Sequence, residues 1–202
     1  MVINILSFIM FALTIKSANG LYIGDVTYTG GTNLLTASFK LYNQEGHLFY
    51  QIIHPDAITF FISNSGEVFA TNEKQLYFYT QTGSVAQLRN LQYPNGFGFS
   101  PDNTLFFASD RNGIYAYSMQ GKIVYQLPPG RLFTSTTQGK RIAIISTDTL
   151  FYYQCGEFKF QKILSNPFVR KIYFSSDEKT LHLELPDSTE LIKISDFCDT
   201  EE

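Results

Sequence analysis

Short runs in which apolar and polar residues alternate dominate the chain after its first twenty positions. Examples are residues 113–117 (Gly-Ile-Tyr-Ala-Tyr) and 122–127 (Lys-Ile-Val-Tyr-Gln-Leu), and Gly, Asn, Asp and Ser separate one run from the next. An apolar residue at every second position is typical of a β-strand with one buried face, and a glycine-containing break between two such runs is typical of a hairpin. No long stretch after position 20 has the period of a helix, about 3.6 residues, so the pattern predicts an all-β protein.

The hairpins recur along the chain at a nearly constant interval. Four turn glycines lie 37, 38 and 35 residues apart, and a tyrosine stands four positions before each of them, giving the pairs Tyr42 and Gly46, Tyr79 and Gly83, Tyr117 and Gly121, and Tyr152 and Gly156. A period of roughly 33 to 50 residues is typical of propeller blades and of solenoids. The repeat favours a propeller over a sandwich or barrel, because those folds do not predict such a regular turn.

A second hairpin precedes the first one in each unit. Clear copies join residues 96–100 to 104–109, 59–63 to 67–70, and 171–175 to 180–183, and degenerate copies begin at 25–28, with a turn at 30–33, and join 132–134 to 141–145. Each unit of about 37 residues then holds four short antiparallel strands, which is the content of one propeller blade. The sequence therefore predicts a small β-propeller of about five four-stranded antiparallel blades.

The last unit lacks a good fourth strand. Residues 189–194 have strand character, but residues 196–202 are short and acidic. Unpaired sheet edges promote aggregation, and pairing of the first and last segments closes a ring, so we expect residues 21–23 to supply the missing partner. If the ring stays open, pairing of two such edges predicts a homodimer.

The first twenty residues have a different character. An apolar run over residues 5–15 is followed by the small residues 17–20. The run is shorter than the roughly 20 residues that span a bilayer, but it has the length of a signal-peptide core, about 7 to 15 residues. We predict a cleaved signal peptide over residues 1–20, a secreted or extracytoplasmic chain, and a single domain over 21–202 without a membrane span. A retained N-terminal anchor is the alternative, and an interior strand is disfavoured because buried strands usually have about 4 to 8 residues.

Composition and cysteine content add little chemistry. Hydrophobic residues make up 44% of the chain, as in soluble globular proteins, and the net charge is −3 without a cluster of Lys and Arg. Nucleic acid is therefore excluded as a partner. Cys155 and Cys198 predict a disulfide in an exported chain, with two unpaired thiols as the alternative. No CxxC motif accompanies them, so no zinc site is expected.

One blade carries a resemblance to a known family. Residues 94–117 contain Pro-Asn-Gly-Phe-Gly-Phe-Ser-Pro-Asp-Asn followed by two alternating strands, and this segment resembles a blade of gluconolactonase-like propellers. The resemblance implies a divergent metal-dependent, lactonase-like hydrolase in which Asn95 is a ligand of an axial Ca²⁺ ion. The corresponding loop at the entry to the next blade, residues 127–133, contains neither Asp nor Asn, so it does not match the acidic metal ligands of that family. Asn95-Gly96 is also a turn dipeptide in its own right.

The remaining candidate site residues lie in loops. His54 and Asp56 stand in a linker between two units, and Asp110 opens a predicted hairpin turn that also explains its presence. The sequence has no Gly-x-Ser-x-Gly elbow, phosphate-binding glycine loop or His-Glu-x-x-His motif. We therefore predict a non-catalytic interaction module without a cofactor. It would bind a protein or glycan through His54, Asp56, Asn95 and Asp110, and the calcium-dependent hydrolase is the alternative.

Overall fold

The computed structural model describes residues 9–31, 34–55, 58–72 and 74–194. The chain forms two compact units, the first from Met1–Tyr93 and Met119–Gly121 and the second from Pro94–Ser118 and Lys122–Glu202. Within the described ranges the only helical element is the short 3-10 helix η1 (Thr137–Gly139), and none is long and apolar enough to cross a membrane. The structure is therefore all-β, as predicted.

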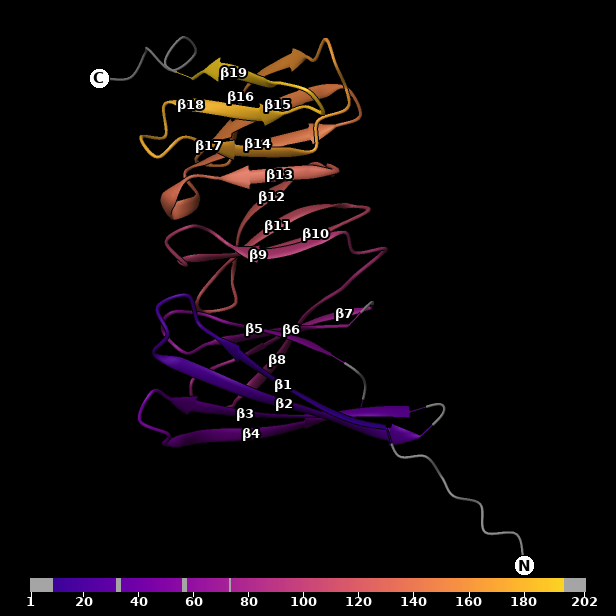
Figure 1. The fold of residues 1–202 in the computed structure, drawn as a ribbon, viewed down its shortest axis with the longest axis vertical. Coiled ribbons are helices and arrows are strands. Elements are labelled where there is room, and N and C mark those ends of the chain that lie inside the picture. The colour runs from indigo at the N-terminus through magenta and orange to yellow at the C-terminus, as the bar shows by residue number, and fades with distance from the viewer. Residues whose placement is uncertain (1–8, 32–33, 56–57, 73, 195–202) are drawn as a thin grey trace, which may run out of the picture. The chain divides into compact units, whose positions relative to one another are not determined.

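Unit 1 contains two antiparallel sheets of four strands (Figure 1). Sheet A has the order β1-β2-β3-β4 and sheet B the order β5-β6-β7-β8. Their strands are β1 (Ile9–Lys16), β2 (Tyr22–Gly31), β3 (Leu34–Asn43), β4 (Leu48–His54), β5 (Thr59–Ile62), β6 (Val68–Thr71), β7 (Gln75–Tyr79) and β8 (Val85–Asn90). Buried aromatic and aliphatic side chains of both sheets, Phe39 and Phe60 among them, form one core.

Unit 2 contains three more antiparallel sheets (Figure 1). Sheet C has the order β12-β11-β10-β9, sheet D the order β13-β14-β15-β16 and sheet E the order β17-β18-β19. Their strands are β9 (Gly96–Phe99), β10 (Leu105–Asp110), β11 (Gly113–Ser118), β12 (Ile123–Leu127), β13 (Leu132–Ser135), β14 (Arg141–Ser146), β15 (Thr149–Gln154), β16 (Glu157–Ile163), β17 (Lys171–Phe174), β18 (Thr180–Glu184) and β19 (Thr189–Lys193). One core joins sheets C and D, and another joins sheets D and E.

The predicted strands of the second to fifth units agree with sheets B to E, but the prediction for the first unit is wrong. The sequence pattern predicts a first strand at residues 25–28, whereas these residues belong to β2, the second strand of sheet A. The first strand is β1, which pairs with β2 from Ile9 opposite Gly30 to Lys16 opposite Ile23. Residues 9–16 are thus a strand, the interpretation that the sequence disfavoured.

The turn after β1 explains why this segment belongs to the repeat. The Ser17 hydroxyl accepts a hydrogen bond from the Tyr22 N–H at 3.1 Å. Hydroxyls occupy the same place after the first strand of the other sheets and accept N–H groups at 2.9 to 3.0 Å, in the pairs Ser63 and Glu67, Ser100 and Leu105, Thr136 and Arg141, and Ser175 and Thr180.

Three residues after each hydroxyl stands a residue with positive φ whose N–H donates to the hydroxyl residue's carbonyl; these are Gly20, Gly66, Asn103, Gly139 and Glu178. The small residues 17–20 therefore match the turn of the repeat as well as they match a cleavage site. Whether residues 1–20 are removed in the cell stays a prediction.

The expected closure through residues 21–23 stays a prediction. In the uncleaved chain strand β2 is hydrogen-bonded to β1 along one edge and to β3 along the other, so such a closure requires the removal of β1. Within the described residues, β18 is the only strand paired with β19. Pairing of two chains through that edge stays a prediction.

The repeated turn glycines meet two requirements. Gly46, Gly83 and Gly156 have φ of 86°, 80° and 84°, a region that favours glycine. A Cβ atom on Gly83 would lie 3.0 Å from Cγ of Tyr50, and one on Gly156 would lie 2.6 Å from Cδ1 of Tyr125. Both tyrosines belong to the fourth strand of the preceding sheet, so the glycine also lets adjacent sheets pack closely.

Candidate functional site

Asp110 has a structural role in its turn. Its side chain is fully buried, and its Oδ1 atom accepts the N–H groups of Asn112 at 2.8 Å and Gly113 at 3.2 Å. Bonds from a carboxylate to the backbone two and three residues ahead stabilise a tight turn. The carboxylate therefore holds the hairpin between β10 and β11.

Asn95 holds the entrance to sheet C. Its backbone N–H donates to the Ser109 carbonyl at 3.0 Å, and its side-chain amide donates to the Gly130 carbonyl at 3.4 Å. Gly130 lies in the loop 127–133, which supplies a backbone carbonyl and no carboxylate there. Among the described residues no three His, Cys, Asp or Glu side chains gather to share a metal ion. The calcium ligand role of Asn95 stays a prediction.

His54 ends strand β4 of unit 1 and is buried, with its ring edge-on to Tyr77 at a centroid distance of 4.9 Å. Asn95 and Asp110 belong to unit 2, so no single unit brings these candidates together. Asp56 lies outside the described residues, as does Cys198. Cys155 is an exposed free thiol in the turn between β15 and β16, and its disulfide with Cys198 stays a prediction.

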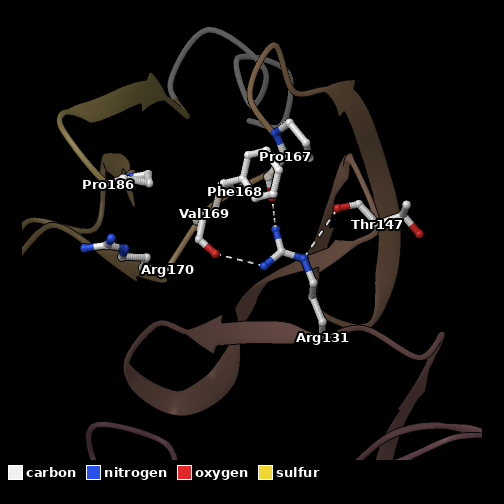
Figure 2. Close-up of a pocket in the computed structure, with 7 residues that line it drawn as sticks. All are labelled: Arg131, Thr147, Pro167, Phe168, Val169, Arg170 and Pro186. Atoms are coloured by element: carbon white, nitrogen blue, oxygen red, sulfur yellow. Dashed lines mark hydrogen bonds between the residues drawn. The ribbon is translucent and has the colours of Figure 1, made fainter.

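A pocket of about 600 Å³ in unit 2 combines cationic and apolar side chains (Figure 2). It forms where three connections meet the start of β13: the β14–β15 turn, the β16–β17 linker and the β18–β19 turn. Its lining consists of Arg131, Thr147, Pro167, Phe168, Val169, Arg170 and Pro186. Asn95 and Asp110 are not part of it.

Arg131 is fixed at the centre of this pocket. Its guanidinium donates through Nη1 to the Val169 carbonyl at 2.8 Å, through Nη2 to the Pro167 carbonyl, and through Nε to the Thr147 carbonyl at 3.4 Å. Figure 2 shows these bonds running from one guanidinium to two separate loops. The side chain therefore cross-links the β14–β15 turn and the β16–β17 linker.

The residue before Arg131 sets its position. A Cβ atom on Gly130 would lie 2.3 Å from Cγ2 of Ile144, so only glycine lets the loop approach β14 this closely. The backbone N–H of Arg131 then donates to the Ile145 carbonyl at 2.9 Å. Close backbone packing thus aims the guanidinium at the neighbouring loops.

The pocket has positive charge and an exposed aromatic ring. The partners of the Arg131 guanidinium are neutral carbonyls, and the described residues provide no ion pair to Arg131 or Arg170. The Phe168 residue is 72% exposed, whereas Val169 beside it is buried. Figure 2 shows the Arg170 side chain extending away from Arg131, on the side of Pro186. An anionic group with an apolar neighbour would complement these walls.

A second pocket of unit 2, about 230 Å³, offers different chemistry. It lies at the turns between the first and second strands and is lined mainly by hydroxyl groups, with Thr134 to Thr137 on one side and Ser175 and Ser176 on the other. Its acidic residue, Glu178, already accepts the Thr137 N–H at 2.7 Å. The lining of this pocket contains no cationic side chain, so it lacks the positive charge of the Arg131 pocket.

Sequence reasoning did not find the Arg131 pocket. Its residues come from four connections that are distant in the sequence, and no motif links them. The available signals were local: Pro-Pro-Gly-Arg at 128–131, a rigid turn before a cation, and Asn-Pro-Phe at 166–168, an aromatic residue in a linker.

Comparison with known proteins agrees with the fold. A scan against protein-family models and a search of curated protein sequences found no match. Among solved structures, the chain is similar to a eukaryotic initiation factor (TM-score 0.70, 12% identity, covering 92% of this chain and 52% of that one). It is also similar to Kluyveromyces lactis Hsv2 (0.59, 10%, 91% and 75%) and Saccharomyces cerevisiae Sqt1 (0.54, 9%, 93% and 71%).

These neighbours are WD40-type propellers. The chain has a β-propeller fold. The predicted all-β propeller class is thereby confirmed. The count of five four-stranded blades and the lactonase resemblance of residues 94–117 stay predictions. The chain spans about half the length of the initiation factor that it matches (52%). At identities of 12% or less, the similarity concerns the fold alone.

Proposed function

We propose that the chain is a non-catalytic interaction module that binds a protein through the Arg131 pocket of unit 2. The observation that carries this proposal is a rigidly held guanidinium beside an exposed phenylalanine, Phe168; no carboxylate of the described residues pairs with that guanidinium. Arginine and aromatic residues are enriched among the side chains that dominate binding energy at protein interfaces. One structural neighbour (TM-score 0.54) comes from the mitotic checkpoint complex, which is consistent with a propeller acting inside an assembly.

Export of the chain is a further part of this proposal, and a glycan is the alternative ligand. A glycan would use the polar groups of the pocket rim, whereas a protein would also use Phe168. Secretion predicts that the exported form begins after residue 17 or 20. Since residues 9–16 form strand β1, such cleavage would remove a paired strand from sheet A. Intact-mass measurement of the protein from an export-competent host would detect either form.

Two measurements separate binding from catalysis. First, cross-linking of the tagged full chain captures a partner protein. The purified partner, mixed with the full chain, should then form a binary complex. A panel of lactones and esters with added Ca²⁺ should give no turnover. Turnover that is lost in Asn95→Ala and kept in the matched turn variant Asn112→Ala would contradict the proposal in favour of the hydrolase.

A further inference from the structure

The charge and the walls of the Arg131 pocket specify a ligand class. We infer that the pocket receives a carboxylate from an acidic peptide segment of the partner protein, with an apolar side chain of that segment packed against Phe168. This inference rests on the proposed function and adds the chemistry of the partner.

The guanidinium of Arg131 is prepared to bind an anion. Arginine carries five N–H donors, and backbone carbonyls occupy three of them at Arg131. The carbonyls are neutral, so the full positive charge remains. The nearby acids Asp148 and Asp187 do not line the pocket, and the ion pairs of the described residues do not include Arg131. A carboxylate would therefore find a charge that the described part of the chain does not neutralise.

Fixing the side chain in advance lowers the cost of binding. An arginine that is free in solution loses rotamer entropy when it is immobilised in a complex. At Arg131 the bonds to Pro167 and Val169 already restrict the side chain before a ligand arrives. Arg170, which is exposed and borders the same pocket, adds a second positive charge.

The apolar walls favour a peptide over a free anion. Phe168 is 72% exposed, and its backbone N–H donates to Oδ1 of Asn166 at 2.9 Å, which helps to hold the loop in place. Pro167 and Pro186 are rigid neighbours on the pocket wall. A phosphate ion or an acidic sugar would use the charge and leave these surfaces in water, whereas an acidic residue next to Leu or Phe uses both.

A peptide array tests the inference directly. One set of peptides places a single Glu or Asp next to Leu or Phe between Gly and Ser residues, and the matched set carries Gln or Asn instead. The full-length chain should bind the best acidic peptides about fivefold more tightly than their amide counterparts, and added salt should reduce the difference. If no acidic peptide binds more tightly than its amide counterpart, the inference is wrong.

Surface variants locate the binding on the molecule. Phe168→Ala and Arg170→Gln should each weaken the best acidic peptide by about fivefold. Their controls are Phe158→Ala, an exposed phenylalanine on β16, and Lys193→Gln, an exposed cation on β19; both should bind as the parent does. Equal loss in the variants and controls would overturn the inference, because the peptide would then bind elsewhere.

The outcomes distinguish this inference from the proposed function. If inorganic phosphate displaces the peptide at concentrations where acetate does not, the site prefers phosphate to a carboxylate and the peptide assignment fails. If the partner protein binds Phe168→Ala and Arg170→Gln as tightly as the parent, the chain is still an interaction module, but the Arg131 pocket is not its binding surface and the inference fails. If no partner is found at all, the proposed function fails as well.

Discussion

Substitution of Gly156 by alanine tests whether the repeated glycine serves sheet packing as well as the turn. Gly156 and Gly46 occupy the same turn position with nearly equal φ, 84° and 86°. They differ in their surroundings, since a Cβ atom at Gly156 would lie 2.6 Å from Cδ1 of Tyr125, whereas one at Gly46 would have no atom within 4 Å. Gly46→Ala is therefore a matched control for the backbone conformation alone.

The magnitudes follow from two separate costs. A side chain in the left-handed region costs roughly 1 to 2 kcal/mol, and the reduced freedom of the unfolded chain returns about 0.4 to 1 kcal/mol. Gly46→Ala should therefore lower the unfolding free energy by about 1 kcal/mol. Gly156→Ala should add an overpacking cost of about 1 to 3 kcal/mol. This difference corresponds to roughly 2 to 12 °C in melting temperature for a domain of this size.

Thermal unfolding followed by circular dichroism, with a double-substitution cycle, decides the matter. Tyr125→Ala removes the ring that the new methyl group would meet, so Gly156→Ala should cost little more than Gly46→Ala in that background. Equal melting temperatures for Gly46→Ala and Gly156→Ala would refute the packing argument. A Gly156→Ala cost that Tyr125→Ala leaves unchanged would refute it too.

Three further predictions concern the turns, the tyrosines and Arg131. Ser17→Ala should lower the free energy of unfolding by about 1 kcal/mol, because the bond to the Tyr22 N–H is lost, and Ser100→Ala should have the same effect in sheet C. If urea unfolding shows that Ser17→Ala leaves the stability unchanged, the turn after β1 does not act as the other turns of the repeat do. Burial, with a smaller contribution from Tyr77, raises the pKa of Tyr79 to about 12. An unfolded tyrosine ionises near pH 10, so between about pH 10 and pH 12 the folded state holds more protons than the unfolded state. The free energy of unfolding should therefore fall there by up to about 1.4 kcal/mol per pH unit. Tyr79→Phe should reduce this fall of the unfolding free energy with pH, measured by urea unfolding between about pH 10 and pH 12. An unchanged pH dependence would mean that other groups cause it. Arg131→Gln should increase hydrogen exchange in the 164–170 linker, since it removes the bonds to the Pro167 and Val169 carbonyls. Unchanged exchange there would show that the linker stays ordered without Arg131.

The strands of four sheets could be predicted because hairpin signals are local. Alternation and a turn glycine such as Gly121 or Gly156 define two strands within about fifteen residues of each other. The first strand of sheet A escaped because an apolar run followed by small residues satisfies both a signal peptide and a strand with its turn. The bond between Ser17 and Tyr22 places this segment in the repeat, and it is visible only in three dimensions.

The candidate site could not be predicted for a different reason. Asn95 and Asp110 are conspicuous in the sequence, yet structural hydrogen bonds account for both: Asn95 bonds to the Gly130 carbonyl, and Asp110 holds its own turn. Arg131 is inconspicuous, and its importance comes from Thr147, Pro167 and Val169, which approach it only after sheets D and E have packed together. When loops that are distant in the sequence meet only in the folded chain, the sequence shows neither a periodic pattern nor a motif for the site that they form.

Hydrogen–deuterium exchange of the full chain, with and without its purified partner, tests the central claim most directly. If the Arg131 pocket is the binding surface, the partner should slow exchange in the pocket segments, residues 130–132, 147–149, 164–170 and 185–188. Exchange in the turns at the second pocket, residues 100–104, 136–140 and 175–179, should stay the same. Protection confined to those turns, or to unit 1, would contradict the account.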